Sequence, residues 1–205
     1  MNQNEKYCEE LLCSRTVYDN KELCVTCSYG KLNVVLDLDN TLIFTCDELY
    51  PPFDFKIKEG YIYLRPFVKE LLAWVFKNTN VFIWSAGDAT YVKKILKHLL
   101  QKDQIPVAVL TRKDCSIEQT SSVSYLFQEY YSSLRYFKPL QKLKFNLKRT
   151  VLIDDHENAK KYNPYNTIQV SKFEIPTTSS DNCLVSILET LKYLESQKNV
   201  QNVLQ

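Results

Sequence analysis

Two aspartates separated by one residue are the feature of this chain best suited to chemistry. Asp37 and Asp39 follow an apolar run at residues 34–36 and precede Thr41. If that run is a strand, its two-residue repeat places both carboxylates on the same side of the strand end. Two carboxylates about 4 Å apart repel each other by roughly 1 to 4 kcal/mol at effective dielectric constants of about 80 to 20. A divalent cation offsets this repulsion. Mg²⁺ suits carboxylates that also receive a substrate phosphate, so the pair points to phosphoryl chemistry.

Polar groups follow two further apolar runs in the same way. Ser85 comes directly after residues 81–84, and Asp154 and Asp155 come directly after residues 151–153. In open α/β sheets, ligands bind beyond the carboxyl ends of the strands. The sequence therefore predicts that these polar groups meet at one edge of a sheet.

Short apolar runs alternate with helical periodicities from residue 31 onward. The predicted core strands are residues 33–38, 81–84, 107–110 and 150–153. The predicted helices are residues 67–76 (with Pro66 at the first helical position), 89–100, a segment from 157 onward, and 181–196. Strands that are buried on both faces and separated by helices are typical of parallel sheets. The predicted fold class is α/β, a three-layer doubly wound, Rossmann-like and mostly parallel sheet.

Three further segments complete the predicted organisation. Residues 53–57 and 61–64 flank Lys58-Glu59-Gly60 and predict a small hairpin insertion. The aromatic segment 121–137 predicts a helix followed by a loop, and residues 197–205 are expected to fray.

The composition indicates one intracellular domain. The 205 residues predict a domain at 31–200 preceded by a cysteine-containing extension at 1–30. A net charge of +2 provides no electrostatic basis for tight nucleic-acid binding. No apolar run approaches 18 residues, so no membrane partner is expected. Seven cysteines without an export signal predict a reducing compartment, either nucleus or cytoplasm.

The order of these motifs resembles a known enzyme family. Asp37, Asp39 and Thr41 match the Asp-x-Asp-x-Thr motif of the aspartate-nucleophile phosphatases in the haloacid-dehalogenase superfamily. The other matching features are, in order, the Arg-Pro segment 64–68, the segment 83–87 with Ser85, Lys138, and the pair Asp154-Asp155. Within the superfamily, the chain is most similar to the protein phosphatases that act on the C-terminal domain (CTD) of RNA polymerase II.

The resemblance implies roles for the central residues. Asp37 would be the nucleophile that forms an aspartyl-phosphate, and Asp39 the general acid and base. Mg²⁺ would be held by Asp37, the Asp39 backbone carbonyl and Asp155, with Asp154 beside them.

Three further residues would face the substrate phosphate if the resemblance holds. Lys138 and Ser85 would stabilise the phosphate oxygens, and Arg112 would lie nearby.

Each of these residues also has a structural interpretation when it is taken alone. Acid pairs such as Asp37/Asp39 and Asp154/Asp155 can cap the helix that follows them. Residues 85–87 can be an ordinary turn after a strand. A lysine in a loop is usually solvated.

The length of one insertion limits the substrate. Only 23 residues separate Thr41 from Arg65, which leaves room for a hairpin but not for a large cap domain. An open site favours a phosphorylated protein segment, such as a polymerase tail, over a small metabolite. Tyr50, Phe53 and Phe55 are predicted to form an apolar wall for a proline-containing peptide.

The N-terminal cysteines leave two interpretations open. Cys8, Cys13, Cys24 and Cys27 have a spacing that could hold a structural Zn²⁺, and inert thiols fit equally well.

The sequence as a whole predicts a Mg²⁺-dependent protein phosphatase acting on phosphoserine or phosphothreonine. Two alternatives stay open: a catalytically silent binding module on the same fold, and a phosphatase for nucleotides or nucleic-acid ends.

Overall fold

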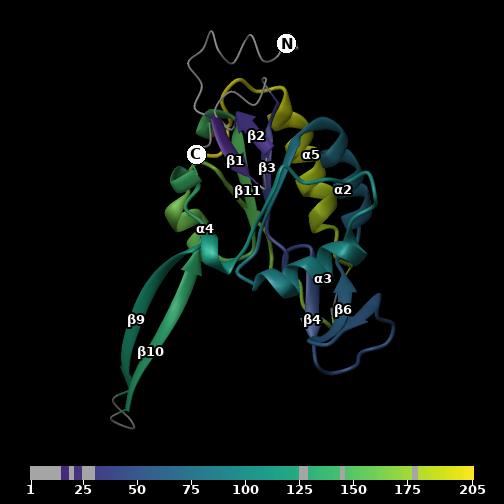
Figure 1. The fold of residues 1–205 in the computed structure, drawn as a ribbon, viewed down its shortest axis with the longest axis vertical. Helices are drawn as coiled ribbons and strands as arrows, with labels where there is room; N and C mark the ends of the chain where they lie inside the picture. The colour runs from purple at the N-terminus through teal and green to yellow at the C-terminus, as the bar shows by residue number, and fades with distance from the viewer. Residues whose placement is uncertain (1–14, 19–20, 25–30, 125–128, 144–145, 177–179) are drawn as a thin grey trace.

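The computed structural model describes residues 15–18, 21–24, 31–124, 129–143, 146–176 and 180–205 (Figure 1). Residues 15–18, 21–24, 120–124, 129–134 and 143 are described by their backbone alone. No helix in these ranges combines the length and apolar character needed to cross a bilayer.

A five-stranded parallel sheet forms the centre of the molecule. Strand β3 (Asn33–Leu36) lies in the middle, and the order across the sheet is β12-β11-β3-β7-β8. The other strands are β7 (Asn80–Trp84), β8 (Ala108–Leu110), β11 (Thr150–Asp154) and β12 (Thr167–Gln169). Leu36 pairs with both Ile83 and Ile153, so these three strands end level with one another. The polar residues that follow them therefore meet at one edge of the sheet.

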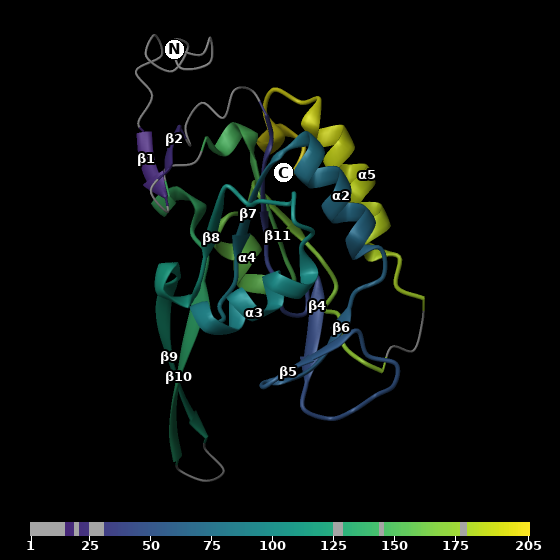
Figure 2. The ribbon, with the colours of Figure 1, turned by 45° about the vertical axis from the view of Figure 1, so that its right-hand side comes forward.

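Helices cover both faces of this sheet. They are α2 (Val68–Asn78), α3 (Ala89–Leu99), α4 (Glu157–Tyr162) and α5 (Cys183–Glu195). Alternate residues of the strands enter different cores: Val34 packs with α2, α3 and α5, whereas Val35 packs on the opposite face with Ala159 of α4. Figures 1 and 2 show α2 and α5 side by side. The predicted three-layer α/β fold is confirmed.

The predicted hairpin insertion belongs to a small antiparallel sheet. Strands β5 (Phe55–Ile57) and β6 (Gly60–Leu64) form the hairpin, and β4 (Ile43–Cys46) adds a third strand in the order β4-β6-β5. Asn40, with φ of 61°, makes the turn between β3 and β4 in the left-handed conformation that asparagine tolerates. Within the described ranges, no large cap domain covers the sheet edge, as predicted.

The prediction of a helix and a loop at 121–137 was wrong. Strands β9 (Ser116–Ser124) and β10 (Glu129–Phe137) instead form a long antiparallel hairpin that projects from the body (Figure 1). Tyrosine, valine and threonine favour strands, and in this segment their strand preference outweighs the helical preference on which the prediction was based. At the base of the hairpin, Phe137 stacks on Tyr162 of α4 with ring centroids 3.8 Å apart.

Two smaller expectations also differ from the structure. Pro66 does not open α2, because Phe67 lies between them as the N-cap, with φ of 67°. The end of the chain does not fray throughout: Val200–Asn202 form a 3₁₀ turn, because Val200 is buried in the main core.

The N-terminal segment contains two strands that the sequence did not predict. Strands β1 (Arg15–Tyr18) and β2 (Lys21–Cys24) pair in antiparallel fashion.

Candidate active site

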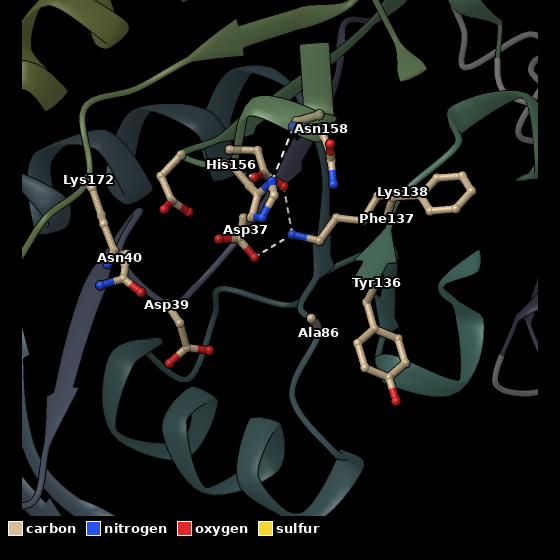
Figure 3. Close-up of a pocket in the computed structure, with 13 residues that line it drawn as sticks. Asp37, Asp39, Asn40, Ala86, Tyr136, Phe137, Lys138, His156, Asn158 and Lys172 are labelled. Atoms are coloured by element: carbon tan, nitrogen blue, oxygen red, sulfur yellow. Dashed lines mark hydrogen bonds and ion pairs between the residues drawn. The ribbon is translucent and has the colours of Figure 1, made fainter. Parts of the chain in front are cut away.

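Three carboxylates meet at the carboxyl edge of the parallel sheet. Asp37 follows β3, Asp154 is the last residue of β11, and Asp155 comes next. One oxygen of each lies within 4.8 Å of the others, and we call these three residues the acid cluster. They line a pocket of about 230 Å³, the candidate pocket, together with Asp39 and Lys138 (Figure 3).

Lys138 joins two members of the acid cluster. Its Nζ forms ion pairs with Asp37 Oδ1 and with Asp154 Oδ2, the latter at 2.7 Å. Burial by itself lowers the pKa of Lys138, but the charges of Asp154 and Asp37 outweigh burial and raise it. Lys138 follows β10 directly, and its carbonyl accepts a hydrogen bond from Asn163 Nδ2 at 2.9 Å. The lysine is therefore a fixed ammonium ion at the centre of the site.

The acid cluster carries more negative charge than Lys138 neutralises. Burial raises the pKa of Asp37 to about 7, although the charge of Lys138 acts in the opposite direction. Burial, followed by the charge of Asp154, also raises the pKa of Asp155. Three closely spaced carboxylate oxygens against one ammonium group form a donor set that suits a hard divalent cation such as Mg²⁺. The residues of the acid cluster therefore fit a bound Mg²⁺ ion.

Thr41 links Asp37 to Asp155. Its buried hydroxyl lies 3.0 Å from Asp37 Oδ2 and 3.2 Å from Asp155 Oδ1, and it accepts a hydrogen bond from the Asp155 N–H at 3.1 Å. The single hydroxyl proton can serve one of the two carboxylates at a time. This contact explains why a threonine suits the position two residues after Asp39.

Asp39 lines the candidate pocket but is not part of the acid cluster. Tyr91, in the first turn of α3, donates its hydroxyl proton to Asp39 Oδ1, and Thr45 lies 2.7 Å from the same hydroxyl. Burial raises the pKa of Asp39, and the hydrogen bond from Tyr91 opposes this shift. Tyr91 was not among the site residues predicted from the sequence. The available signal was its position in the first turn of the predicted helix 89–100, which follows the predicted strand 81–84.

Ser85 contacts Asp39 instead of lining the pocket. Its hydroxyl lies 3.5 Å from Asp39 Oδ2 and accepts a hydrogen bond from the Gly87 N–H at 2.9 Å. Arg112 is also apart from the acid cluster. Its Nε donates to the Ala86 carbonyl at 2.7 Å, and its guanidinium lies 5.3 Å from the Tyr136 ring centroid.

The predicted apolar wall does not border the candidate pocket. The Tyr50 N–H donates to Tyr63 at 2.7 Å, and Phe53 packs edge-on against Tyr61. Phe55 stacks on His98 with ring centroids 4.7 Å apart. None of the three predicted residues is among those lining the pocket.

Several residues that line the candidate pocket were not singled out from the sequence. They are Asn40, Ala86, Tyr136, Phe137, His156, Asn158, Ala159 and Lys172. They come from the loops after β3, β7, β11 and β12, from the end of β10 and from α4 (Figure 3). These residue types are common in loops and at the ends of strands and helices, so a single sequence offers no pattern that distinguishes them.

The cysteines proposed to bind zinc lie outside the residues whose side chains are described. Cys8, Cys13 and Cys27 fall in undescribed segments, and only the backbone of Cys24 in β2 is described. The zinc site stays a prediction.

Comparisons with known proteins agree with this geometry. The model of the family "NLI interacting factor-like phosphatase" matches residues 32–201. A CTD phosphatase-like protein, 355R, of Invertebrate iridescent virus 6 is 32% identical over 158 residues, covering 69% of this chain and 85% of the viral protein. Its counterpart in Invertebrate iridescent virus 3 is 29% identical over 184 residues, with coverages of 78% and 94%.

A solved structure extends the similarity to the fold. The fission yeast RNA polymerase II CTD phosphatase Fcp1 bound to beryllium fluoride superposes with a TM-score of 0.53 and 17% identity. The alignment covers 98% of this chain and 57% of the yeast chain, so this protein spans little more than half of that structure. The resemblance stated from the motifs is confirmed, and the chain belongs to the family of NLI interacting factor-like, CTD phosphatase-like proteins.

Proposed function

We propose that this protein is a Mg²⁺-dependent phosphatase that removes phosphate from phosphoserine or phosphothreonine in a protein segment. The observation that carries the proposal is that Lys138 forms ion pairs with both Asp37 and Asp154. Asp155 completes the acid cluster, and Asp39 lines the same pocket. In this proposal, the nucleophile Asp37, the acid–base group Asp39 and the cation-binding carboxylates all border one small pocket.

Three protein groups would hold the metal ion. They are the carboxylates of Asp37 and Asp155 and the backbone carbonyl of Asp39. Asp154 is less suited, because its Oδ2 accepts from Lys138 at 2.7 Å and its Oδ1 from the His156 N–H at 2.8 Å. When bound, Mg²⁺ neutralises charge on the phosphoryl oxygens.

The first chemical step transfers the phosphoryl group to Asp37. A carboxylate oxygen of Asp37 attacks the phosphorus, and the bond between phosphorus and the serine or threonine oxygen breaks. Asp39 gives its proton to that leaving oxygen. The raised pKa of Asp39 favours the protonated form that this step requires. Lys138 stabilises negative charge on the transferring group.

The second step hydrolyses the aspartyl-phosphate. Asp39, now a carboxylate, takes a proton from a water molecule while that water's oxygen attacks the phosphorus. The bond between phosphorus and Asp37 breaks, inorganic phosphate leaves, and Asp39 is again protonated. Tyr91 holds Asp39 in place for both transfers.

A protein substrate is supported by the open site and by the relatives. No large cap domain covers the candidate pocket within the described residues, so a bulky chain can approach it. The relatives are named for phosphatases of the polymerase C-terminal domain, which makes a phosphorylated polymerase tail the first substrate to test.

One assay tests the reaction and its substrate class together. Hydrolysis of a small aryl phosphate, a phosphorylated heptad-repeat peptide and a 3′-phosphorylated oligonucleotide is measured with and without Mg²⁺. We expect Mg²⁺-dependent hydrolysis of the first two and loss of turnover in Asp37→Asn. Activity that survives in Asp37→Asn would refute the assignment of Asp37 as the nucleophile. Preference for the oligonucleotide would refute the substrate class, and inactivity on all three would indicate a silent binding module.

A further inference from the structure

A second concave surface lies beside the candidate pocket and shares one side chain with it. This surface, the hairpin groove, has a volume of about 400 Å³, and its lining includes Ala89, Arg112, Cys115, Ile117 and Tyr136. Tyr136 also lines the candidate pocket. Two adjoining cavities that share a side chain can hold neighbouring parts of one ligand.

The base of the β9–β10 hairpin fixes the shape of this groove. Ile117 pairs with Tyr136, and both side chains line the groove. Glu118, the next residue of β9, points to the opposite face of the hairpin, where Lys161 of α4 approaches it at 3.3 Å. One face of the hairpin base therefore rests on α4, while the other faces the groove.

The groove combines apolar surface with a cation next to an aromatic ring. Ile117 has 56% of its surface exposed, although it is a large apolar residue. The Arg112 guanidinium lies 5.3 Å from the Tyr136 ring centroid and is held there by the hydrogen bond to the Ala86 carbonyl. A planar aromatic side chain could cover Ile117 and also lie against the ring or the guanidinium. Aliphatic side chains would gain only the first of these contacts.

We propose that the hairpin groove binds an aromatic side chain of the phosphoprotein substrate, one to three residues from the phosphorylated residue. This inference rests on the proposed function, since it requires a phosphorylated protein segment at the acid cluster. An extended chain advances about 3.5 Å per residue, so a few residues suffice to pass from one side of Tyr136 to the other. The hairpin thereby selects substrates by sequence near the phosphate.

Phosphoserine peptides with one aromatic residue test this selection. A tyrosine is placed at each of the three positions before and after the phosphoserine, and each peptide is compared with its alanine counterpart. We expect tyrosine at one or two positions to raise kcat/KM by about 5- to 20-fold, through burial of apolar area and ring contacts. The Ile117→Ser variant should lose most of this preference while hydrolysing a small aryl phosphate as the unaltered protein does.

A matched variant controls for general effects of the substitution. Ile105 is also exposed, at 68%, and does not line the hairpin groove, so Ile105→Ser should keep the preference. Equal kcat/KM for tyrosine and alanine peptides at all six positions would overturn the inference, as would a preference that Ile117→Ser retains. Failure of the proposed function has a different signature, because then no peptide is hydrolysed in an Asp37-dependent way.

Discussion

The hydroxyl of Tyr91 donates a hydrogen bond to Asp39, a residue 52 positions earlier in the chain. Tyr91 lies in the first turn of α3, whose N-cap Asp88 accepts hydrogen bonds from the backbone N–H groups of Thr90 and Tyr91. The capped helix end therefore carries the hydroxyl to Asp39. The orientation of the proposed acid–base group thus depends on how α3 packs against the sheet.

Replacing Tyr91 by phenylalanine should impair general acid catalysis. The aromatic ring at position 91 is kept, but Asp39 loses the hydroxyl group that donates a hydrogen bond to it. Because hydrogen bonds to charged groups contribute about 1.5–3 kcal/mol, we expect kcat/KM for a phosphoserine peptide to fall roughly 10- to 100-fold. The fall should be smaller for an aryl phosphate, whose leaving group needs less protonation.

Steady-state kinetics on both substrates provide the measurement. Tyr61→Phe is the control, because the Tyr61 hydroxyl makes an exposed hydrogen bond, which it accepts from Lys56 at 3.0 Å. Because kcat/KM reports the first chemical step and not the shared hydrolysis of the aspartyl-phosphate, an equal loss of kcat/KM on the two substrates would show that Tyr91 does not assist Asp39 as a general acid.

Removing Lys138 should destabilise the fold as well as stop catalysis. Lys138→Met leaves the buried carboxylates of Asp37 and Asp154 without their cation. Breaking a buried ion pair in this way costs about 3–5 kcal/mol. Urea unfolding in EDTA should show this loss. Asp37→Asn should cost less stability in the Lys138→Met background than alone, and strictly additive effects would contradict a coupled pair.

Binding of Mg²⁺ should depend more on Asp155 than on Asp154. We expect Asp155→Asn to weaken Mg²⁺ binding on the order of 10-fold or more, by removing one of two carboxylate ligands. Isothermal titration calorimetry of the purified variants measures this directly. The exposed Asp103→Asn should bind as the unaltered protein does. If Asp154→Asn weakens binding more than Asp155→Asn, the two carboxylates have exchanged the roles proposed for them.

Arg65 should stabilise the loop that carries the Asp-x-Asp-x-Thr motif. Its buried guanidinium donates to the Thr41 carbonyl at 3.1 Å, to Asp181 at 2.8 Å and to Ser171 at 2.9 Å. Lysine cannot reproduce this fork of donors. We expect Arg65→Lys to lower the free energy of unfolding by about 2–3 kcal/mol, because buried acceptors lose their partners.

Chemical denaturation measures the Arg65 effect. The exposed Arg135→Lys on β10 should change stability by less than about 0.5 kcal/mol. Equal stabilities of the two variants would rule out the structural role of Arg65.

The amino-acid sequence was sufficient for four of the five strands of the central sheet and for the acid cluster, but the short edge strand β12 was not predicted. Runs such as residues 81–84 and 150–153 are apolar on both faces, and only a strand covered on both sides accommodates them. Asp37, Asp154 and Asp155 follow such strands directly. The parallel arrangement then makes their proximity a consequence of local patterns.

The sequence was not sufficient where side chains meet without a repeating pattern. The Tyr91–Asp39 contact depends on the docking of α3, and Tyr50, Phe53 and Phe55 do not line the candidate pocket. The aromatic residues of segment 121–137 fit a helix or a strand locally, and for this reason the prediction of a helix followed by a loop was wrong.

Local patterns thus determined which strands form and which carboxylates end them, since burial and periodicity act over a few residues. Tertiary packing alone decided which hydroxyl reaches Asp39, which residues border the pocket and where the hairpin groove lies. The physical reason is that contacts between distant segments depend on the relative placement of whole elements, and no short stretch of sequence encodes that placement.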